Sequence, residues 1–280
     1  MTATDSAGPL DPGGPVLLVG AGKMGGALLD GWLARGLDPR LVAVVDPGLP
    51  EAAAAALAAN GATVAPEPGA IQHPSAILFA VKPQVAAAAL PTAAAFAGPE
   101  TVVVSILAGT TLATLGAGLP SETAIVRAMP NTPAAVGRGI TACVANAHVS
   151  AGQKALADAL LSAAGAVEWV ADEALIDAVT GVSGSGPAYV FLLVETLAKA
   201  GVAAGLPADL AARLARATVE GSGELLRLSP DAPETLRTNV TSPNGTTAAA
   251  LAVLMADDGL GPLMERAVRA AAARARELAG

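Results

Sequence analysis

The chain has 280 residues, of which 53% are hydrophobic and 14% are charged, and its formal net charge is -8. This length allows one large domain or two ordinary domains, and the apolar composition excludes a disordered chain. The negative charge argues against a nucleic-acid partner, because phosphate binding needs a basic surface, and the single cysteine, Cys143, excludes an intrachain disulfide.

The first part of the chain alternates short apolar runs with helical patterns. Residues 1–14 are polar and lack an apolar secretory segment, so a disordered leader is expected there. Strands are expected at residues 15–20, 41–45, 76–81, 101–105 and 124–127, and helices at 24–36, at 50–60 and after Pro83. This alternation predicts an α/β fold with a parallel, doubly wound sheet.

The later part of the chain changes character near residue 172. Strands at 140–144 and 167–170 flank a helix at 151–164, and beyond residue 171 the patterns predict helices at 173–181, 187–205, 207–228, 233–240, 246–257 and 259–279. We therefore expect a Rossmann-type domain over residues 15–172, followed by an all-α domain over residues 173–280. Alanine-rich helices bury little area per residue, so contacts between subunits are expected to contribute to stability.

The longest uncharged window, residues 101–121, needs a check for membrane insertion. It contains three glycines and Pro120, which would interrupt a spanning helix, so a strand, a turn and a short helix are expected instead. We expect a soluble, cytoplasmic protein with no membrane association.

A glycine-rich turn joins the first predicted strand to the first predicted helix. The pattern is G-x-G-x-x-G, in the strand–turn–helix context that dinucleotide binding needs. Phosphates would meet the free N–H groups and the positive end of the helix. The predicted cofactor-binding residues of this turn are Gly20, Ala21, Gly22, Lys23, Met24 and Gly25.

Asp46 ends the second predicted strand and is a further candidate for cofactor binding. An acid at this place accepts hydrogen bonds from an adenosine ribose, which favours NADH without excluding NADPH. The alternative is a turn-forming aspartate before Pro47.

Two more segments end predicted strands at the same edge of the sheet. Ala80, Val81, Lys82 and Pro83 stand at the carboxyl edge, where cofactors lie in such sheets, and Lys82 could face the cofactor or be a solvated residue. Asn131 is an uncharged donor suited to a nicotinamide or a substrate, and its alternative role is to form a turn.

The stretch TSPNGTT, residues 241–247, precedes a predicted helix and carries four hydroxyl groups. Free backbone N–H groups and the helix dipole would form a small anion pocket there, with Gly245 allowing close approach. Ordinary helix capping explains one hydroxyl group but not four. The similar entry at residues 180–187 is either a close helix crossing or a second wall of this pocket.

The chain lacks a set of residues for metal binding or for a nucleophilic triad. His73 and His148 are the only histidines, and neither stands in a metal-ligand pattern, so no metal is expected. Oxidation of an alcohol usually needs a base, whereas an imine carries its own basic nitrogen. The sequence therefore favours imine reduction.

These segments together resemble the pyrroline-5-carboxylate reductase family. The resemblance runs from Val16 to about Arg276 and rests on VGAGKMGGAL, FAVKP, VSILAG, VRAMPNTPAAVGRGIT, DAVTGVSGSGPAYVF and TSPNGTTAAAL. It implies reduction of L-1-pyrroline-5-carboxylate to L-proline, the last step of proline biosynthesis, by hydride transfer from NADPH or NADH. It also implies a homodimer through the C-terminal helices, and decamers built from such dimers are common in the family.

The resemblance also implies roles by position. Ser242 and the backbone of Gly245 and Thr246 would hold the substrate carboxylate, and Thr247 would hydrogen-bond the ring nitrogen as the catalytic residue. Residues 20–25 and 80–83 would line the cofactor. Two positions depart from the family pattern. Asn244 stands where glycine is usual, although asparagine tolerates left-handed geometry. Asp46 stands where many members have a small or basic residue, which leaves the cofactor preference open.

Two rival functions remain at this point. A related imine or β-hydroxyacid reductase would share the architecture, but a β-hydroxyacid enzyme needs a general acid in the helical part. Lys199 is the only lysine after residue 154 and lies inside a predicted helix. A non-catalytic dinucleotide-binding sensor would keep the glycine turn without needing TSPNGTT.

Overall fold

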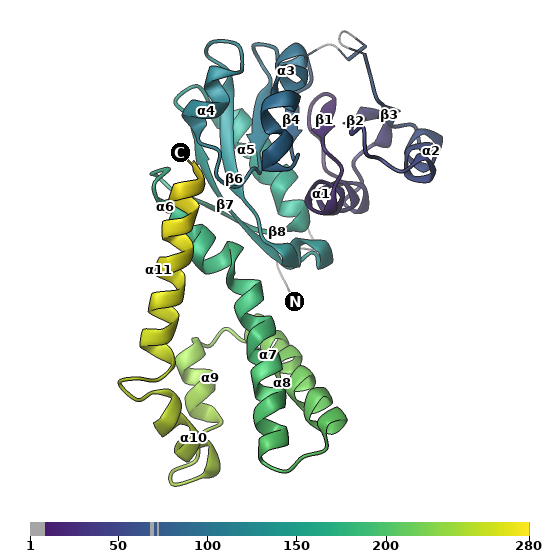
Figure 1. Ribbon diagram of the computed structural model, residues 1–280. Helices are drawn as coiled ribbons and strands as arrows, with labels where there is room; N and C mark the ends of the chain where they lie inside the picture. Colours follow the sequence, from purple (N-terminus) through teal and green to yellow (C-terminus); the bar gives the residue numbers. More distant parts are fainter. Residues whose placement is uncertain (1–8, 68–69, 72, 280) are drawn as a thin grey trace. The chain divides into compact units, whose positions relative to one another are not determined.

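The computed structural model describes residues 9–67, 70–71 and 73–279, and these form two compact units (Figure 1). The sheet unit comprises the residues up to Gly184 together with those from Ala271 onward, and the helical unit comprises Ser185–Ala270. The predicted boundary at residues 172 and 173 lies before this division, because the segment that follows it packs with the sheet unit.

The sheet unit is built on one sheet, whose strand order over the described residues is β3-β2-β1-β4-β5-β6-β7-β8. The strands are β1 (Val16–Val19), β2 (Val42–Val45), β3 (Thr63–Val64), β4 (Ala76–Phe79), β5 (Val102–Ser105), β6 (Ala124–Met129), β7 (Gly139–Ala145) and β8 (Gly165–Trp169). Strand order reverses direction beside β1, as in dinucleotide-binding sheets.

Neighbouring strands run parallel except β6 and β7, which pair antiparallel. The parallel sheet predicted from the first five strands is confirmed, and the direction of β7 was not predicted. The connection between the two strands holds only a short 3-10 turn, Thr132–Val136. A parallel return would need a crossover of a dozen or more residues, so β7 comes back alongside β6 in the opposite direction.

Helices cover both faces of the sheet. They are α1 (Lys23–Ala34), α2 (Glu51–Ala59), α3 (Ala86–Phe96), α4 (Leu112–Ala117), α5 (Ala151–Leu161) and α6 (Leu175–Val179). Side chains of β1 alternate between two apolar clusters: Leu18 packs in the cluster that contains residues of α1 and α5, and Leu17 packs in the one that contains residues of α3 and α4. Burial on both faces explains why these strands read as continuous apolar runs.

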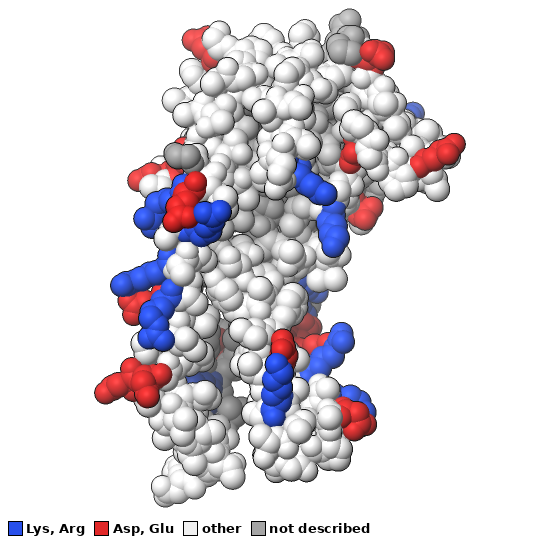
Figure 2. Space-filling view, viewed as in Figure 1, with Lys and Arg blue, Asp and Glu red and all other residues white. Residues whose placement is uncertain are grey.

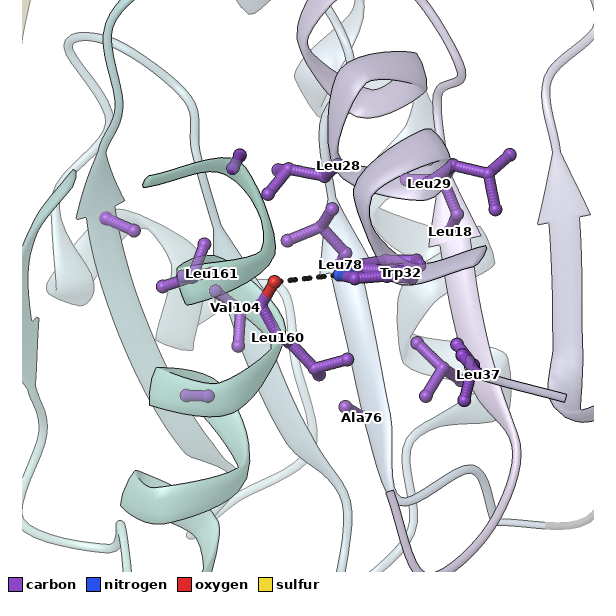
Figure 3. Close-up of a cluster of buried hydrophobic side chains, with 14 of the residues drawn as sticks. Leu18, Leu28, Leu29, Trp32, Leu37, Ala76, Leu78, Val104, Leu160 and Leu161 are labelled. Atoms are coloured by element: carbon purple, nitrogen blue, oxygen red, sulfur yellow. Dashed lines mark hydrogen bonds between the residues drawn. The ribbon is translucent and has the colours of Figure 1, made fainter. Parts of the chain in front are cut away.

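Trp32 of α1 is the largest side chain in the first cluster and is fully buried (Figure 3). Its indole N–H donates a hydrogen bond of 2.8 Å to the carbonyl oxygen of Leu160 on α5. Leu28, Leu78 and Val104 surround it with apolar groups. This contact joins two helices on one face of the sheet, and it satisfies the only polar atom of the side chain.

The start of the chain differs from the prediction. Leu10 is buried, and its backbone N–H donates to the carbonyl oxygen of Arg35 at 3.1 Å. The disordered leader predicted over residues 1–14 is therefore too long, since residues 9–14 are part of the sheet unit. The rest of that prediction, residues 1–8, lies outside the described residues.

The helical unit confirms the all-α prediction for the C-terminal part. Its helices are α7 (Gly186–Ala203), α8 (Ala208–Leu228), α9 (Pro233–Asn239), α10 (Thr246–Leu254) and the first part of α11 (Leu260–Ala279), whose end belongs to the sheet unit. Helices α7 and α8 pack side by side (Figure 1). A Cβ added to Gly201 would lie 3.2 Å from the Cβ of Ala211, so the glycine permits this close packing.

Exposed apolar side chains are frequent throughout the helical unit, and one set of them lies on α7 and α8. We call this set the apolar face: Val190, Phe191, Leu192, Leu193, Leu197 and Val202 on α7, and Leu214, Leu225, Leu226 and Leu228 on α8. Among the described residues, the helical run Leu175–Ala203 is the one stretch long and apolar enough to cross a membrane by length and composition. So much exposed apolar surface indicates an interaction surface.

Candidate functional site

The glycine turn begins with Gly20, directly after β1. Its φ angle is +93°, a conformation that side chains other than hydrogen rarely allow. A Cβ at this position would lie 2.8 Å from the carbonyl carbon and oxygen of Ala80, at the end of β4. Glycine therefore lets the turn lie directly against the end of the neighbouring strand.

Gly22 and Gly25 have different surroundings. A Cβ on Gly25 would collide with the carbonyl oxygen of Gly20, so this glycine lets α1 pack closely on the turn. Around Gly22, by contrast, no atom lies within 4 Å of an added Cβ. Gly22 is the N-cap of α1 and makes no side-chain cap hydrogen bond. The backbone at the helix start is thus accessible, as binding of an anion requires.

Asp46 follows β2 and holds two backbone groups. One carboxylate oxygen accepts a hydrogen bond of 2.7 Å from the N–H of Ala21, and the other accepts one of 2.8 Å from the N–H of Gly48. The predicted alternative, a turn-forming aspartate, agrees with the bond to Gly48. The bond to Ala21 is not explained by that role, because it joins the carboxylate to the glycine turn after β1.

A cleft of about 480 Å³ opens where the turn, α1 and the end of β2 meet. Its lining contains the predicted Ala21, Gly22, Lys23 and Asp46, together with Gly26, Ala27, Asp30, Gly48, Leu49, Pro50 and Ala135. Sequence reasoning missed Asp30, although a signal was present. Residues 23, 26, 27 and 30 are spaced to share one face of a helix.

The other predicted cofactor residues lie at the same edge of the sheet. Ala80 pairs with β1 through its N–H, which donates to the carbonyl oxygen of Val19 at 2.8 Å. Val81 packs against the second cluster, and Lys82 is exposed just before the short turn that begins at Pro83. Met24 packs partly against the first cluster.

Asn131 is buried, and both the oxygen and the nitrogen of its side-chain amide form hydrogen bonds with backbone groups. The amide oxygen accepts from the N–H of Ile140 at 2.9 Å, and the amide nitrogen donates to the carbonyl oxygen of Ser183 at 3.1 Å. Ser183 belongs to a π-helical segment, Thr180–Gly184, and such segments are frequent at functional sites. Asn131 therefore joins β7 to the π-helical segment within the sheet unit.

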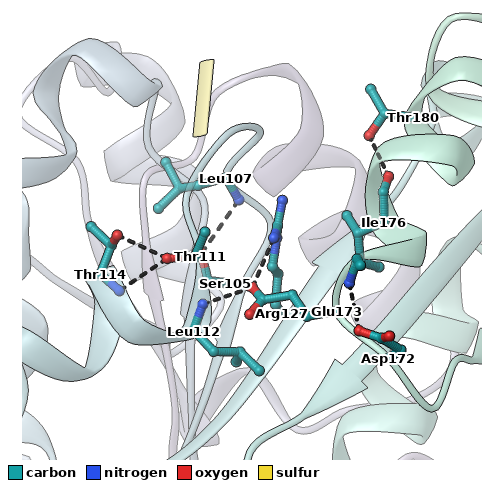
Figure 4. A network of polar contacts seen from close by, with 11 residues as sticks. Ser105, Leu107, Thr111, Leu112, Thr114, Arg127, Asp172, Glu173, Ile176 and Thr180 are labelled. Carbon is teal, nitrogen blue, oxygen red and sulfur yellow. Dashed lines mark hydrogen bonds and ion pairs between the residues drawn. The ribbon is translucent and has the colours of Figure 1, made fainter. Parts of the chain in front are cut away.

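An ion pair between a buried arginine and a half-buried glutamate supports the same region (Figure 4). The guanidinium of Arg127 on β6 donates to the carboxylate of Glu173 at 2.7 Å, and the same carboxylate oxygen accepts from the N–H of Leu112 at 2.8 Å. Sequence reasoning missed this pair. The signal was a charged residue inside an apolar strand, which needs a partner when it is buried.

The TSPNGTT stretch lies in the helical unit, at the start of α10. Gly245 is the N-cap, and α10 has no side-chain cap hydrogen bond. Asn244 has a φ angle of +58°, so it adopts the left-handed conformation that asparagine tolerates. The departure from the family's glycine is therefore accommodated by the loop.

The hydroxyl group of Ser242 faces the N-cap. A side chain at position 245 would collide with the Ser242 Oγ, and the N–H of Gly245 donates to the Ser242 carbonyl oxygen at 3.1 Å. Thr246 is exposed and Thr247 is half-buried in the first turn of the helix. The four predicted substrate residues, Ser242, Gly245, Thr246 and Thr247, thus surround one helix start.

A largely parallel sheet, a glycine turn at its carboxyl edge and an acid after β2 define a Rossmann-type dinucleotide-binding protein with a helical second part. A family model described as pyrroline-5-carboxylate reductase dimerisation matches residues 173–278, and one described as NADP oxidoreductase coenzyme F420-dependent matches residues 15–109. A pyrroline-5-carboxylate reductase of Pseudomonas aeruginosa is 41% identical over 264 residues, covering 94% of this chain and 96% of the relative. The chain belongs to the pyrroline-5-carboxylate reductase family.

Other relatives agree with this family. The pyrroline-5-carboxylate reductase of Synechocystis is 50% identical over 202 residues, or 72% of this chain and 74% of the relative. The solved structure of the Coxiella burnetii enzyme has a TM-score of 0.86 and 32% identity, covering 95% of this chain and 99% of the other. The solved structure of the Plasmodium falciparum enzyme with NADP bound has a TM-score of 0.77 and 28% identity, covering 95% of this chain and 98% of the other.

Proposed function

We propose that this chain reduces L-1-pyrroline-5-carboxylate to L-proline with NADPH or NADH, the last step of proline biosynthesis. The observation that carries the proposal is the start of α10. In a chain of this family, TSPNGTT presents an uncapped helix end beside the Ser242 hydroxyl. That arrangement suits a carboxylate, because the N–H groups and the helix dipole stabilise negative charge without a cationic side chain.

The residues of the sheet unit fit a dinucleotide. Open space beside Gly22 leaves room for a pyrophosphate at the start of α1, and the cleft continues past Asp46. The residues Gly20–Gly25, Ala80–Pro83 and Asn131 complete the proposed cofactor site. When bound, the reduced nicotinamide supplies a hydride to C5 of the ring imine.

The helical unit would hold the substrate. The Ser242 hydroxyl and the backbone N–H groups of Gly245 and Thr246 bind the carboxylate, which fixes one end of the ring. The Thr247 hydroxyl forms a hydrogen bond with the ring nitrogen and orients the C=N bond. The imine nitrogen is basic and carries the proton that appears on the product amine, so the chain needs no general acid of its own.

Dimer formation through the C-terminal helices follows from the dimerisation family model, and the apolar face offers a surface for it. We infer that this face packs against a second copy rather than lipid, since α7 also carries the ion pair between Glu195 and Lys199. A decamer built from dimers and a cytoplasmic location are further proposals. On the face that Figure 2 shows, charges of both signs are scattered on an uncharged surface, which argues against nucleic acid.

An assay of the purified chain with pyrroline-5-carboxylate tests the function directly. Loss of the reduced-nicotinamide absorbance, with proline as product, is the expected result with at least one of NADH and NADPH. Turnover of a β-hydroxyacid instead would identify the rival reductase. Cofactor binding without turnover of either substrate would identify the sensor.

The variant Thr247→Val tests the proposed role of the hydroxyl group. One neutral hydrogen bond contributes about 0.5–1.5 kcal/mol, so kcat should fall by roughly three- to tenfold while cofactor affinity stays nearly the same. The matched control is Thr246→Val, which removes a hydroxyl without a proposed role and should reduce kcat less. An unchanged kcat in Thr247→Val would remove this residue from the mechanism.

A further inference from the structure

The Asp46 carboxylate is held in place from two sides. Its two oxygens accept hydrogen bonds from different backbone N–H groups, those of Ala21 and Gly48. Ala21 lies in the glycine turn and Gly48 lies in the loop after β2. If the carboxylate rotated away, both N–H groups would lose this partner, and the loss would cost more free energy at the partly buried Ala21 bond than at the exposed Gly48 bond. The negative charge is therefore a fixed feature of the cleft.

This fixed charge lies where the adenosine ribose of a dinucleotide binds. In Rossmann-type sheets, an acid at the end of the second strand accepts hydrogen bonds from the ribose 2′-hydroxyl, whereas a 2′-phosphate is accommodated by a nearby arginine. The residue after Asp46 is Pro47, and the loop continues through Gly48 and Leu49. Pro47 has no charge and no backbone N–H with which to hold a phosphate.

The charges that line the cleft also oppose a 2′-phosphate. The charged lining residues are Lys23, Asp30 and Asp46. Lys23 is the first residue of α1, so it stands at the helix start, where the pyrophosphate is expected. Two carboxylates then remain in the rest of the cleft, and like charges brought together in an interface are strongly unfavourable.

From these contacts we propose that Asp46 makes this chain prefer NADH over NADPH. The inference rests on the proposed function, since it concerns the cofactor of that same reaction. It distinguishes this chain from the Plasmodium falciparum relative, whose solved structure has NADP bound. The anchored carboxylate acts twice: it accepts a hydrogen bond from the free 2′-hydroxyl, and it repels the phosphate that replaces this group.

Equilibrium binding without substrate tests the preference directly. Titration calorimetry of the unaltered chain with NADH and with NADPH should give a Kd for NADH that is about tenfold lower, as expected for one fixed like-charge contact at a partly exposed site. A preference for NADH above about threefold supports the inference. A smaller preference, or any preference for NADPH, overturns it.

Two variants and a matched control assign the effect to Asp46. Asp46→Ser and Asp46→Asn should each reduce the ratio of the two Kd values by about fivefold or more, chiefly by strengthening NADPH binding. The control Asp30→Asn removes the same charge from another wall of the cleft and should change the ratio less. Equal changes in Asp30→Asn and in both Asp46 variants would overturn the role of Asp46.

Parallel kinetics with pyrroline-5-carboxylate separate this inference from the proposed function. Turnover with NADPH as good as that with NADH would overturn the cofactor preference and leave the reductase activity standing. Failure of turnover with both cofactors would instead contradict the function, even if NADH bound more tightly.

Discussion

The sheet unit and the helical unit differ in what they bury. The sheet unit contains two clusters of fully buried apolar side chains, including Trp32 and Phe79. In the described residues of the helical unit, the buried apolar side chains are Ala211 and Ala215, while Phe191 is 68% exposed. Two alanines bury little area, so the helical unit needs a second copy to complete its core. The first unit is stabilised within the chain, and the second is stabilised by assembly.

The largest effect should come from breaking the assembly. Leu193 and Leu197 are one helical turn apart on the apolar face. Changing both to glutamate would bury two unpaired charges in the dimer, which costs several kcal/mol for each charge. Analytical ultracentrifugation should then show monomers, and reductase activity should be lost.

A charge change elsewhere on α7 serves as the control. Glu195→Gln removes a charge from an exposed ion pair with Lys199 and should leave the dimer intact, because such pairs contribute about 0–1 kcal/mol. If the double glutamate variant still sedimented as a dimer, the apolar face would not be the interface.

An intermediate effect is expected from the core of the sheet unit. Trp32→Ala should lower the free energy of unfolding by about 3–5 kcal/mol, because it opens a cavity and leaves the Leu160 carbonyl without its partner. Trp32→Phe keeps most of the packing and should cost less. Urea denaturation at two protein concentrations should show that this loss is independent of concentration, in contrast to the effect of the α7 variant. A concentration-dependent loss would contradict a core complete within one chain.

The smallest effect concerns how the buried Cys143 thiol makes the stability of that core depend on pH. Burial raises the pKa of the Cys143 thiol to about 12, from a usual value of 9.0. The unfolded chain then loses the thiol proton at a lower pH than the folded chain does, so stability declines as the pH rises from 9 towards 12. Near pH 10 the thiol lowers the free energy of unfolding by about 1.4 kcal/mol relative to pH values well below 9.

Cys143→Ala should remove this part of the pH dependence. Chemical denaturation of both proteins at about pH 8 and pH 10 should show a smaller decline in the variant, whatever constant packing energy it loses. Equal declines would mean that water reaches the thiol in the folded chain.

Local signals in the sequence predicted most of the sheet unit. The apolar runs and the glycine turn predicted the core strands, because burial on both faces leaves a continuous pattern. Strand β3 was missed, since two residues are too few to show a period. The antiparallel return of β7 was also missed, although the short connection after β6 excludes a parallel crossover.

The candidate site shows the same limit. The turn at Gly20 and the left-handed Asn244 were predictable, because each depends on local backbone geometry. The bonds of Asn131 to Ile140 and Ser183 were not, since those partners are brought near only by the fold. The periodic patterns of a sequence do not reveal which distant residues will form hydrogen bonds with a buried polar side chain.

The chain leaves the sheet unit at Gly184 and returns to it at Ala271. The returning end packs there: the Leu278 carbonyl oxygen lies 3.0 Å from the place a Cβ on Gly109 would occupy, and Arg276 pairs with Asp177 at 3.6 Å. A protease cut in the connection between α8 and α9 would therefore leave two fragments, each of which contains residues of the sheet unit. Such a nicked molecule would migrate as one species until a denaturant separated its pieces.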